Sequence, residues 1–523
     1  MLEEFNIKNK DKYYLLFLLI FSSILVIHYI NFNVKVGVSC SDVYIYLINA
    51  LYYTGTNRGI TEFIYLSPLI CFLTSILFQF GLVDKLAIFI VTGLFARLGN
   101  FGIYFLFKQY YDENLSLCGA IIYSTTSLSL TWLANGTLDV PAVGMTIWFA
   151  LFTIIAINKN PKYYRYAIPI CAIAFFTRYT LILTVPPLLL YYLYQKGFKI
   201  DAKDWKYIKQ GIIIGIIITI IILATVLIMG HGQFGAASQM ANGIAGKQGA
   251  NTDPAYNTEL GYYLFNLPNF ISNSHTVFEG NPVLENPTIL SWVPFILIIL
   301  GAVLWLKDNK PDLNRKHIIP LAIFLIAILT YTRISSVLTT LIILLGLYLI
   351  GKESENKTGY MMIAWILANF IFFSYYSIKV NRYILPIFPP LIYFILKSVS
   401  IIQENIKINR NIIPVILICL FIIQGFAFTE TFEPTDKYTA TEKISEYIMD
   451  INPDYHDIDI GVYNVRPYRW WIGDNVVGIP SSQIDKIQES NVTYYISNAK
   501  LNNLENYSEI KNIDTIYLYE KNR

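Results

Sequence analysis

Two carboxylates stand where long apolar stretches of the chain begin or end. Asp42 follows the first apolar run, in GVSCSDVYIYLINALYY, and Asp139 lies between two further runs, in NGTLDVPAVG. A carboxylate at the mouth of a cavity can accept a proton from a hydroxyl group or orient that group, which is general-base chemistry. The alternative is that each residue caps the helix that follows it, because Asp is a favoured N-cap and Pro141 fits a first helical turn.

Isolated cations occupy similar places. Arg178 interrupts FFTRYT, and Lys379 and Arg382 lie together in SIKVNRYILPIFPP. Each taken alone could be a side chain that reaches from the membrane to its surface. Several such cations near two carboxylates suit an anionic lipid headgroup such as a phosphate. Arg97, inside the apolar run LFARLGN, is expected to face the bundle interior, either paired or near that headgroup.

The elements that position these residues are membrane helices. Of the 523 residues, 55% are hydrophobic and only 14% are charged. Apolar stretches of about 18 or more residues recur, and each can cross a hydrocarbon layer of about 30 Å as a helix. The first follows three lysines and is expected to be retained, since it is too long for a signal peptide. The stretches predict about thirteen spans: 13–33, 86–107, 115–134, 140–157, 165–177, 180–194, 210–229, 289–306, 317–332, 335–350, 359–378, 383–400 and 411–428.

The distribution of lysine and arginine predicts the orientation. With the N-terminus in the cytoplasm, the inner segments hold 21 Lys and Arg and the short outer segments hold 8. This bias is typical of multi-pass proteins and places Asp42 and Asp139 together on the outer face. In a rival arrangement, 63–80 crosses the membrane and 165–194 forms one span. That arrangement moves Asp139 inside and three cations outside, so the charge bias disfavours it.

A change in composition near Thr429 predicts two domains. Residues 1–429 form a transmembrane part, with an outer loop at 34–85 that includes an interfacial segment, 63–80, and a second outer loop at 230–288. Residues 430–523 hold 9 basic and 16 acidic residues and form an extracytoplasmic domain. The order helix (TATEKISEYIMDI), strand (DIGVY), aromatic turn (RPYRWWIG), helix (481–489) and strands (VTYYIS, TIYLYEK) predicts a small α/β unit.

Motifs for nucleotides and metals are missing from the sequence. It contains no Walker sequence, no GxGxxG and no HExxH, and its five cysteines lie far apart. A nucleotide cofactor or a nucleic-acid partner therefore has no support. A divalent metal stays possible, although no ligand spacing argues for it.

The ordered motifs resemble those of the GT-C class of polytopic glycosyltransferases. The nearest branch is the superfamily of dolichyl-phosphate-mannose protein mannosyltransferases and lipid A aminoarabinose transferases. In that superfamily the first outer loop has an acidic residue and a Tyr two positions later, and Asp42 and Tyr44 of this chain resemble this pair. The segment LDVPAVGMTIWFALF resembles the t-D-x-P motif of the superfamily. The l-t-K/R turn is similar to FFTRYTLIL, and the R-Y-l-l-P-i-x-P segment to NRYILPIFPPLIYFIL.

Two departures from the pattern concern the site. Members often have Asp-Glu in the first loop, where this chain has Asp42-Val43, and some have Lys-Pro-Pro-Leu where it has Leu66-Ser67-Pro68-Leu69. The lysine is thus missing, which leaves the phosphate to Arg178, Lys379, Arg382 or Arg58.

The resemblance implies a membrane transferase that moves a hexose or pentose from a polyprenyl (dolichyl) phosphate to a protein or lipid-linked glycan. The reaction would take place on the outer face of the cell membrane and invert the anomeric centre. Asp42 would be the base, and Asp139 would hold its surroundings or bind sugar hydroxyls. The residues expected to contact substrate are Tyr44, Arg58, Arg97, Arg178, Lys379, Arg382 and Tyr383.

A lipid or sugar transporter without covalent chemistry is the alternative. Transporters typically show internal repeats, whereas the loops and the acidic outer domain of this chain occur once each. The sequence therefore favours the enzyme.

Overall fold

The computed structural model describes residues 4–5, 7–55, 66–228, 259–272, 289–308, 318–331, 333–376, 379–406, 409–431 and 438–522. Helices fill most of the chain up to Thr429, and the strands lie in the C-terminal part. The α-helices before Thr429 are α1 (Asn9–Val36), α2 (Ser41–Thr54), α3 (Pro68–Gln79), α4 (Leu86–Phe107), α5 (Glu113–Thr125), α6 (Ser127–Ala134), α7 (Asp139–Asn158), α8 (Tyr164–Thr177), α9 (Val185–Lys196), α10 (Ala202–Ile228), α12 (Tyr262–Phe265), α13 (Leu267–Ser272), α14 (Ile289–Asp308), α15 (Ile318–Thr330), α16 (Ser336–Gly351), α17 (Lys357–Tyr375), α18 (Phe388–Ile406) and α19 (Ile412–Thr429). Short 3-10 helices connect some of them: η1 (Pro161–Tyr163), η2 (Tyr179–Thr184) and η4 (Asn381–Ile387).

Several of these helices can cross a membrane. Within the described residues, seven helices are long and apolar enough, and the pair α5 and α6, bent by 52°, adds an eighth if it forms one span. Four shorter apolar helices accompany them, among them Pro68–Gln79. The protein is therefore a multi-pass membrane protein, and the count of thirteen spans stays a prediction. Helix α3, with 12 residues, covers about 18 Å, which is less than a hydrocarbon core of about 30 Å.

Helices α7, α8 and α9 run back and forth through the bundle. The ring of Phe152 in α7 stacks on Tyr163, which precedes α8, so α8 starts beside the end of α7. Helix α8 ends at Thr177, and the next residue, Arg178, pairs with Asp139 at the start of α7. Helix α9 then returns, because its Tyr191 accepts a hydrogen bond of 2.9 Å from Asn158, the last residue of α7. The stretch 165–194 therefore forms two helices of opposite direction, as the thirteen-span arrangement requires.

The C-terminal part is a small α/β unit. Its helices are α20 (Thr439–Ile451), α21 (Val465–Trp471) and α22 (Ile484–Glu489), and its strands are β1 (Ile460–Val462), β2 (Val476–Gly478), β3 (Tyr494–Ser497), β4 (Tyr507–Ile513) and β5 (Ile516–Lys521). The sheet order is β2-β1-β3-β5-β4, with β1 parallel to β2 and β3, and β5 antiparallel to β3 and β4. Each of the three expected strands is present. The two edge strands β2 and β4 were not expected, and RPYRWWIG forms helix α21 and its end rather than a turn.

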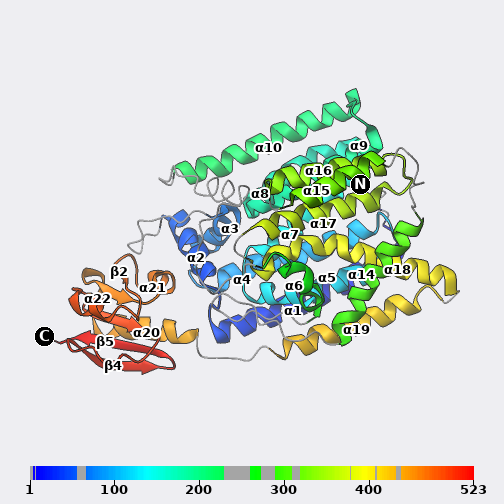
Figure 1. Cartoon of the computed structure of the whole chain (residues 1–523). Coiled ribbons are helices and arrows are strands. Elements are labelled where there is room, and N and C mark those ends of the chain that lie inside the picture. Colours follow the sequence, from blue (N-terminus) through cyan, green and yellow to red (C-terminus); the bar gives the residue numbers. More distant parts are fainter. Residues whose placement is uncertain are drawn as a thin grey trace.

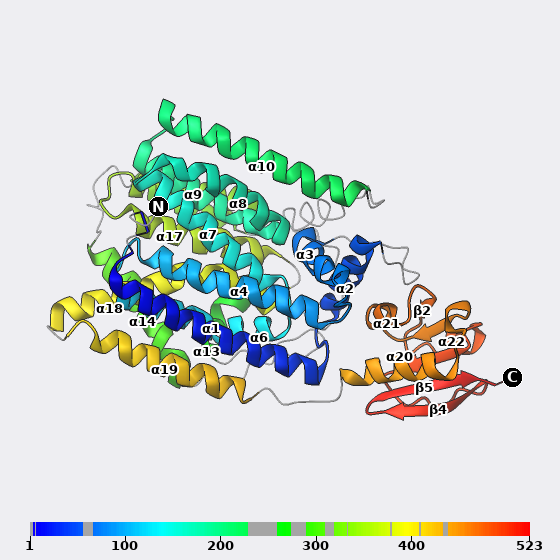
Figure 2. The ribbon, with the colours of Figure 1, turned by 180° about the vertical axis from the view of Figure 1, so that it is seen from behind.

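The C-terminal unit lies against one end of the helical bundle, beside α2 and α3, and the N-terminus lies at the other end (Figures 1 and 2). Trp470 of α21 is fully buried in an apolar cluster formed mainly by α2, α3 and α4, with its ring centroid 5.9 Å from that of Phe78. Lys85, before α4, donates a hydrogen bond of 2.5 Å to Glu442 of α20. A large aromatic side chain and a partly buried ion pair therefore help to hold the two parts together.

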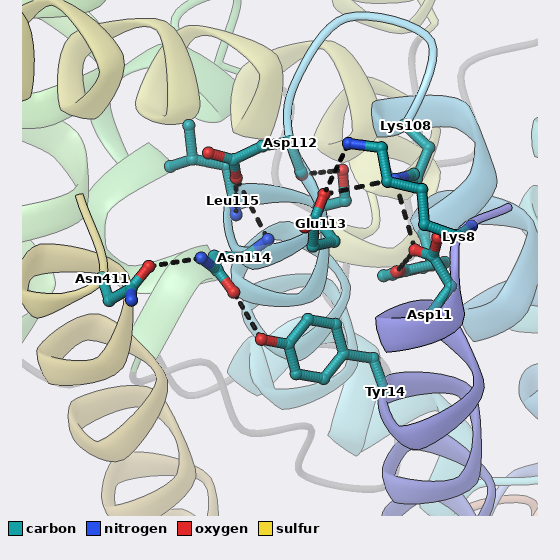
Figure 3. A network of polar contacts seen from close by, with 11 residues as sticks. Lys8, Asp11, Tyr14, Lys108, Asp112, Glu113, Asn114, Leu115 and Asn411 are labelled. Atoms are coloured by element: carbon teal, nitrogen blue, oxygen red, sulfur yellow. Dashed lines mark hydrogen bonds and ion pairs between the residues drawn. The ribbon is translucent and has the colours of Figure 1, made fainter. Parts of the chain in front are cut away.

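The opposite end of the bundle is tied by a charged network (Figure 3). Asp11 of α1 is fully buried, accepts hydrogen bonds from the backbone of Lys8 and from the hydroxyl of Tyr104, and lies 3.2 Å from Lys108 Nζ. The same ammonium group lies 3.6 Å from Glu113 at the start of α5. These contacts join α1, α4 and α5, and buried charges are tolerated when they are paired in this way.

We expect Lys108→Met to destabilise the protein strongly, because Asp11 would lose its buried cation. Removing one partner of a buried ion pair costs about 3–5 kcal/mol, so the melting temperature in detergent should fall by several degrees. The matched control is Lys10→Met, since Lys10 is exposed. Equal melting temperatures for the two variants would contradict this account of the network.

Candidate active site

Asp42 and Asp139 come from two different helices and face one cluster of arginines. Asp42 is in the first turn of α2, and Asp139 is the first residue of α7. The residues at the N-cap positions are Cys40 and Leu138, and neither helix has a side-chain capping hydrogen bond. The N-cap interpretation of the two carboxylates is therefore wrong. Both still benefit from the positive end of a helix dipole, which favours a carboxylate in the first turn.

Arg382 links the two carboxylates. It lies in η4, a 3-10 segment that ends where α18 begins, and its side chain is 12% exposed. Its Nη2 donates a hydrogen bond of 2.6 Å to Asp42 Oδ2, and its Nε lies 3.9 Å from Asp139 Oδ2. Nη1 and Nε are buried and have no hydrogen-bond partner among the described residues. A buried guanidinium with N–H groups left over can bind a further acceptor.

Arg178 pairs with the other oxygen of Asp139. This residue directly follows α8, and its extended backbone directs the chain into η2. Aromatic rings hold the two guanidinium groups: that of Arg178 lies 5.1 Å from the ring centroid of Tyr383, and that of Arg382 lies 4.9 Å from the ring centroid of Trp132. Trp132 in turn donates a hydrogen bond of 3.0 Å to Asn381, next to Arg382. These cation–π contacts favour the observed positions of both guanidinium groups.

A cavity of about 180 Å³ opens beside the cluster. Three charged side chains reach its wall, those of Asp42, Arg178 and Arg382, and aromatic side chains form much of the remainder. The other lining residues are Tyr46, Leu66, Ser67, Leu138, Tyr179, Thr180, Phe372, Phe373, Tyr376 and Tyr383. Asp139 is not among the lining residues and its side chain is 3% exposed, so it acts on the site through the two arginines.

The charge of Asp42 is fixed by its surroundings. Burial opposes its ionisation, but the guanidinium groups of Arg382, Arg466 and Arg178, together with the hydrogen bond from Arg382, outweigh burial and hold the pKa of Asp42 below its ordinary value. The neighbouring thiol of Cys40 is neutral, because burial raises its pKa to about 11. Asp42 is therefore a carboxylate at neutral pH.

The structure brings some of the predicted substrate contacts together and separates others. Arg178, Arg382 and Tyr383 line the cavity, whereas Lys379 is buried behind it and donates a hydrogen bond of 2.8 Å to the carbonyl of Tyr376. Arg97 lies within α4 and does not line the cavity.

Tyr44 is buried in the apolar cluster that also contains Trp470, away from the cavity wall. Tyr44 is therefore not a cavity residue. Arg58 is outside the described residues.

Sequence reasoning missed two kinds of residue. Arg466 of α21 reaches Asp42 Oδ1 at 3.3 Å although 424 positions separate them. The aromatic residues Trp132, Phe373 and Tyr376 sit inside runs that look uniformly apolar, so their sequence context does not distinguish them from lipid-facing residues. The only signal for Arg466 was the unusual RPYRWWIG segment, with two cations among aromatics in an acidic domain.

Metal ligands do not gather at this site. In the part of the chain that the structure describes, no three His, Cys, Asp or Glu side chains lie close enough to hold a metal ion. The carboxylates of Asp42 and Asp139 are instead neutralised by guanidinium groups.

Comparisons with known proteins agree with this fold. A protein-family model described as dolichyl-phosphate-mannose-protein mannosyltransferase matches residues 66–226, which include Asp139 and Arg178. A search of curated proteins found no match.

Solved structures show where the fold occurs. The crystal structure of ArnT from Cupriavidus metallidurans bound to undecaprenyl phosphate has a TM-score of 0.58 and 10% identity, with 96% of this chain and 97% of that chain covered. The archaeal oligosaccharyltransferase AglB from Archaeoglobus fulgidus, in complex with an inhibitory peptide and a dolichol-phosphate, has a TM-score of 0.54 and 11% identity. The match covers 94% of this chain and 70% of that one. The chain thus has the fold of the GT-C class of glycosyltransferases and resembles the superfamily of protein mannosyltransferases and ArnT.

The lowered pKa of Asp42 makes a prediction about stability. A carboxyl group whose pKa is lower in the folded state stabilises the fold above its ordinary pKa of about 3.9, and this contribution is lost as the pH falls through the lowered value. Asp42→Asn should therefore lower the melting temperature at pH 7, and the difference from the wild type should shrink as the pH falls below about 4.

The control is Asp485→Asn, because Asp485 is exposed on α22. That variant should follow the wild type at every pH. A difference between Asp42→Asn and the wild type that stays constant from pH 7 to pH 3 would contradict the electrostatic account of Asp42.

Proposed function

We propose that the protein is a membrane glycosyltransferase that transfers a sugar from a polyprenyl phosphate to an acceptor hydroxyl or amide on a protein or lipid-linked glycan. The observation that carries this proposal is the arginine cluster: Arg178 and Arg382 line a cavity together with Asp42, and Arg382 keeps buried N–H groups without partners among the described residues. The family-model match and the fold likeness to ArnT, whose structure contains undecaprenyl phosphate, support the choice of donor.

The charges of the cluster suit a phosphodiester. Three guanidinium groups, those of Arg178, Arg382 and Arg466, contact two carboxylates, which leaves one positive charge. A sugar phosphodiester carries one negative charge, so the occupied site would be neutral. Arginine suits this task because its planar fork can bind two phosphate oxygens at once.

The transfer would keep that balance. The acceptor oxygen attacks the anomeric carbon while the bond from that carbon to the phosphate oxygen breaks, and the phosphate leaves with the electron pair. The acceptor proton passes to Asp42, which loses its charge as the phosphate gains a second one. Arg382, which contacts Asp42 at 2.6 Å, would then strengthen its contact with the phosphate. A single displacement of this kind inverts the anomeric centre.

Each of the remaining residues has a narrower role. Asp139 positions Arg178 and Arg382 from behind the cavity, and Tyr383 supports the guanidinium groups through its ring. The aromatic wall of Phe373 and Tyr376 offers faces on which a sugar ring can pack. The charge bias of the loops supports an outer location for the site and the C-terminal domain, with the N-terminus in the cytoplasm.

Replacing Asp42 by Asn should reduce sugar transfer by about 10²–10⁴-fold, because the acceptor proton would lose its base. Purified protein would be assayed with a radiolabelled polyprenyl-phosphate sugar and an acceptor pool from the membrane. Binding of the donor should persist, since the arginines remain. Asp485→Asn, on an exposed surface, is the control and should retain wild-type transfer.

Full transfer by Asp42→Asn would contradict the role of Asp42. Lipid movement across vesicles without any transfer by the wild type would instead favour the transporter alternative.

Replacing Arg382 by Lys should lower the transfer rate by about 10²–10³-fold, because the charge is kept but the fork that can hold the leaving phosphate is lost. The rate would be measured at saturating donor. The matched control is Arg333→Lys, since Arg333 is exposed at another loop of the bundle. A lysine at position 382 that supports the wild-type rate would show that a point charge is sufficient and that the fork has no part in the reaction.

A further inference from the structure

The carboxylate of Asp42 is held from two sides by different parts of the molecule. Oδ2 accepts the 2.6 Å hydrogen bond from Arg382 of the helical bundle, and Oδ1 lies 3.3 Å from Nη1 of Arg466, which belongs to the C-terminal domain. The same nitrogen lies 3.4 Å from the hydroxyl of Ser41, the first residue of α2. Arg466 therefore contacts the first turn of the helix that carries Asp42 as well as the carboxylate itself.

The direction of Arg466 follows from the way its domain docks. Trp470 lies four residues later on α21, and residues four apart share one face of a helix. Trp470 is fully buried against the apolar cluster of the bundle, so the face that carries Arg466 is turned toward α2. The pair of Lys85 and Glu442 fixes the neighbouring helix α20. The position of Arg466 thus depends on docking of the whole domain.

The surroundings of Asp42 show what kind of effect Arg466 has on this carboxylate. Among the described residues, the charged and titratable groups that face Asp42 are Arg382 from η4, Arg178 at the end of α8, Cys40 before α2, Tyr46 on α2 and Arg466 on α21. Asp139, at the start of α7, lies on the other side of Arg382. The side chain of Arg466 is 47% exposed and that of Arg382 only 12%, so water screens Arg466 more strongly. The main effect of Arg466 is geometric, because it contacts Oδ1 of Asp42 while Arg382 contacts Oδ2.

We propose that the C-terminal domain completes the active site, with Arg466 as a positioning residue that holds the carboxylate of Asp42 toward the acceptor. This inference rests on the proposed glycosyl transfer. It makes docking of the domain a condition for transfer, because an undocked domain would leave Asp42 with Arg382 as its one side-chain hydrogen-bond donor among the described residues. Donor binding depends on the domain less strongly, because the two guanidinium groups that line the cavity, those of Arg178 and Arg382, belong to the bundle.

The test compares Arg466→Ala and Arg466→Lys with the wild type in full-length protein. Arg466→Ala should lower kcat about 10- to 100-fold with little change in the KM for the donor, since a misplaced reactive group can cost about 10²-fold. The acid limb of its pH–rate profile should move to higher pH, because one of the cations that lower the pKa of Asp42 is gone. Arg466→Lys should recover part of kcat and of the pH profile.

Lys486→Ala is the matched control, because it removes an exposed cation from the same domain without touching the site. It should behave as the wild type. Reversing the ion pair of Lys85 and Glu442 tests whether docking of the domain matters for transfer. Lys85→Glu should lower kcat, and the double variant Lys85→Glu with Glu442→Lys should restore it.

A measurement without activity separates this inference from the proposed function. A thermal double-mutant cycle of Asp42→Asn and Arg466→Ala should be non-additive, since each variant removes the same contact. An additive cycle, or a wild-type kcat and acid limb in Arg466→Ala, overturns the inference. A wild-type protein that transfers no sugar from any polyprenyl phosphate contradicts the proposed function, whatever the cycle shows.

Discussion

The site depends on one buried guanidinium, that of Arg382, between two carboxylates from different helices. Removing charges from water is costly, so such a cluster persists only when each charge has partners in a fixed geometry. Arg382 meets Asp42 of α2 and Asp139 of α7, and the second partner of Asp139 is Arg178 at the end of α8. Four segments of the bundle, α2, α7, η4 and the end of α8, are thus held at one point by ion pairs. The rings of Trp132 and Tyr383 limit where the guanidinium groups can move.

The same arrangement explains why the carboxylate of Asp42 can remain charged beside a cavity lined by aromatic rings. Burial alone would favour the neutral acid, but the arginines reverse that preference for Asp42. A base with a lowered pKa is weak at rest. In the proposed reaction the departing phosphate gains negative charge and attracts Arg382 more strongly. The interaction of Arg382 with Asp42 then weakens, and Asp42 becomes a stronger base. Departure of the leaving group and uptake of the proton therefore assist each other.

Sequence reasoning predicted the parts of this site that depend on local patterns. The isolated charges Asp42, Asp139, Arg178 and Arg382 stand out against apolar stretches, and the bias of lysine and arginine placed all four at one end of the bundle. The direction of α8 and α9 followed from the same bias. The helix α20 and the strands β1, β3 and β5 follow periodicity and were also predicted.

Features that depend on tertiary contacts could not be predicted. Nothing in the residues around Arg466 indicates that α21 docks beside Asp42, because that contact joins residues 424 positions apart. The edge strand β2 has only 3 residues, and β4 is mostly exposed and polar. Neither sequence shows a clear alternation of apolar and polar residues. Tyr44 and Lys379 were expected to contact the substrate. The direction of their side chains depends on the packing around them, and this packing turns Tyr44 toward the apolar cluster that contains Trp470.

The central claim is that the buried N–H groups of Arg382 bind the phosphate of a polyprenyl lipid. A cryo-electron microscopy structure of the full-length protein with bound polyprenyl phosphate tests it most directly. The account predicts phosphate oxygens within hydrogen-bond distance of Arg382 and Arg178, with Asp42 facing the same cavity. A phosphate bound at another surface, with Arg382 still paired to both carboxylates as in the free protein, would contradict it.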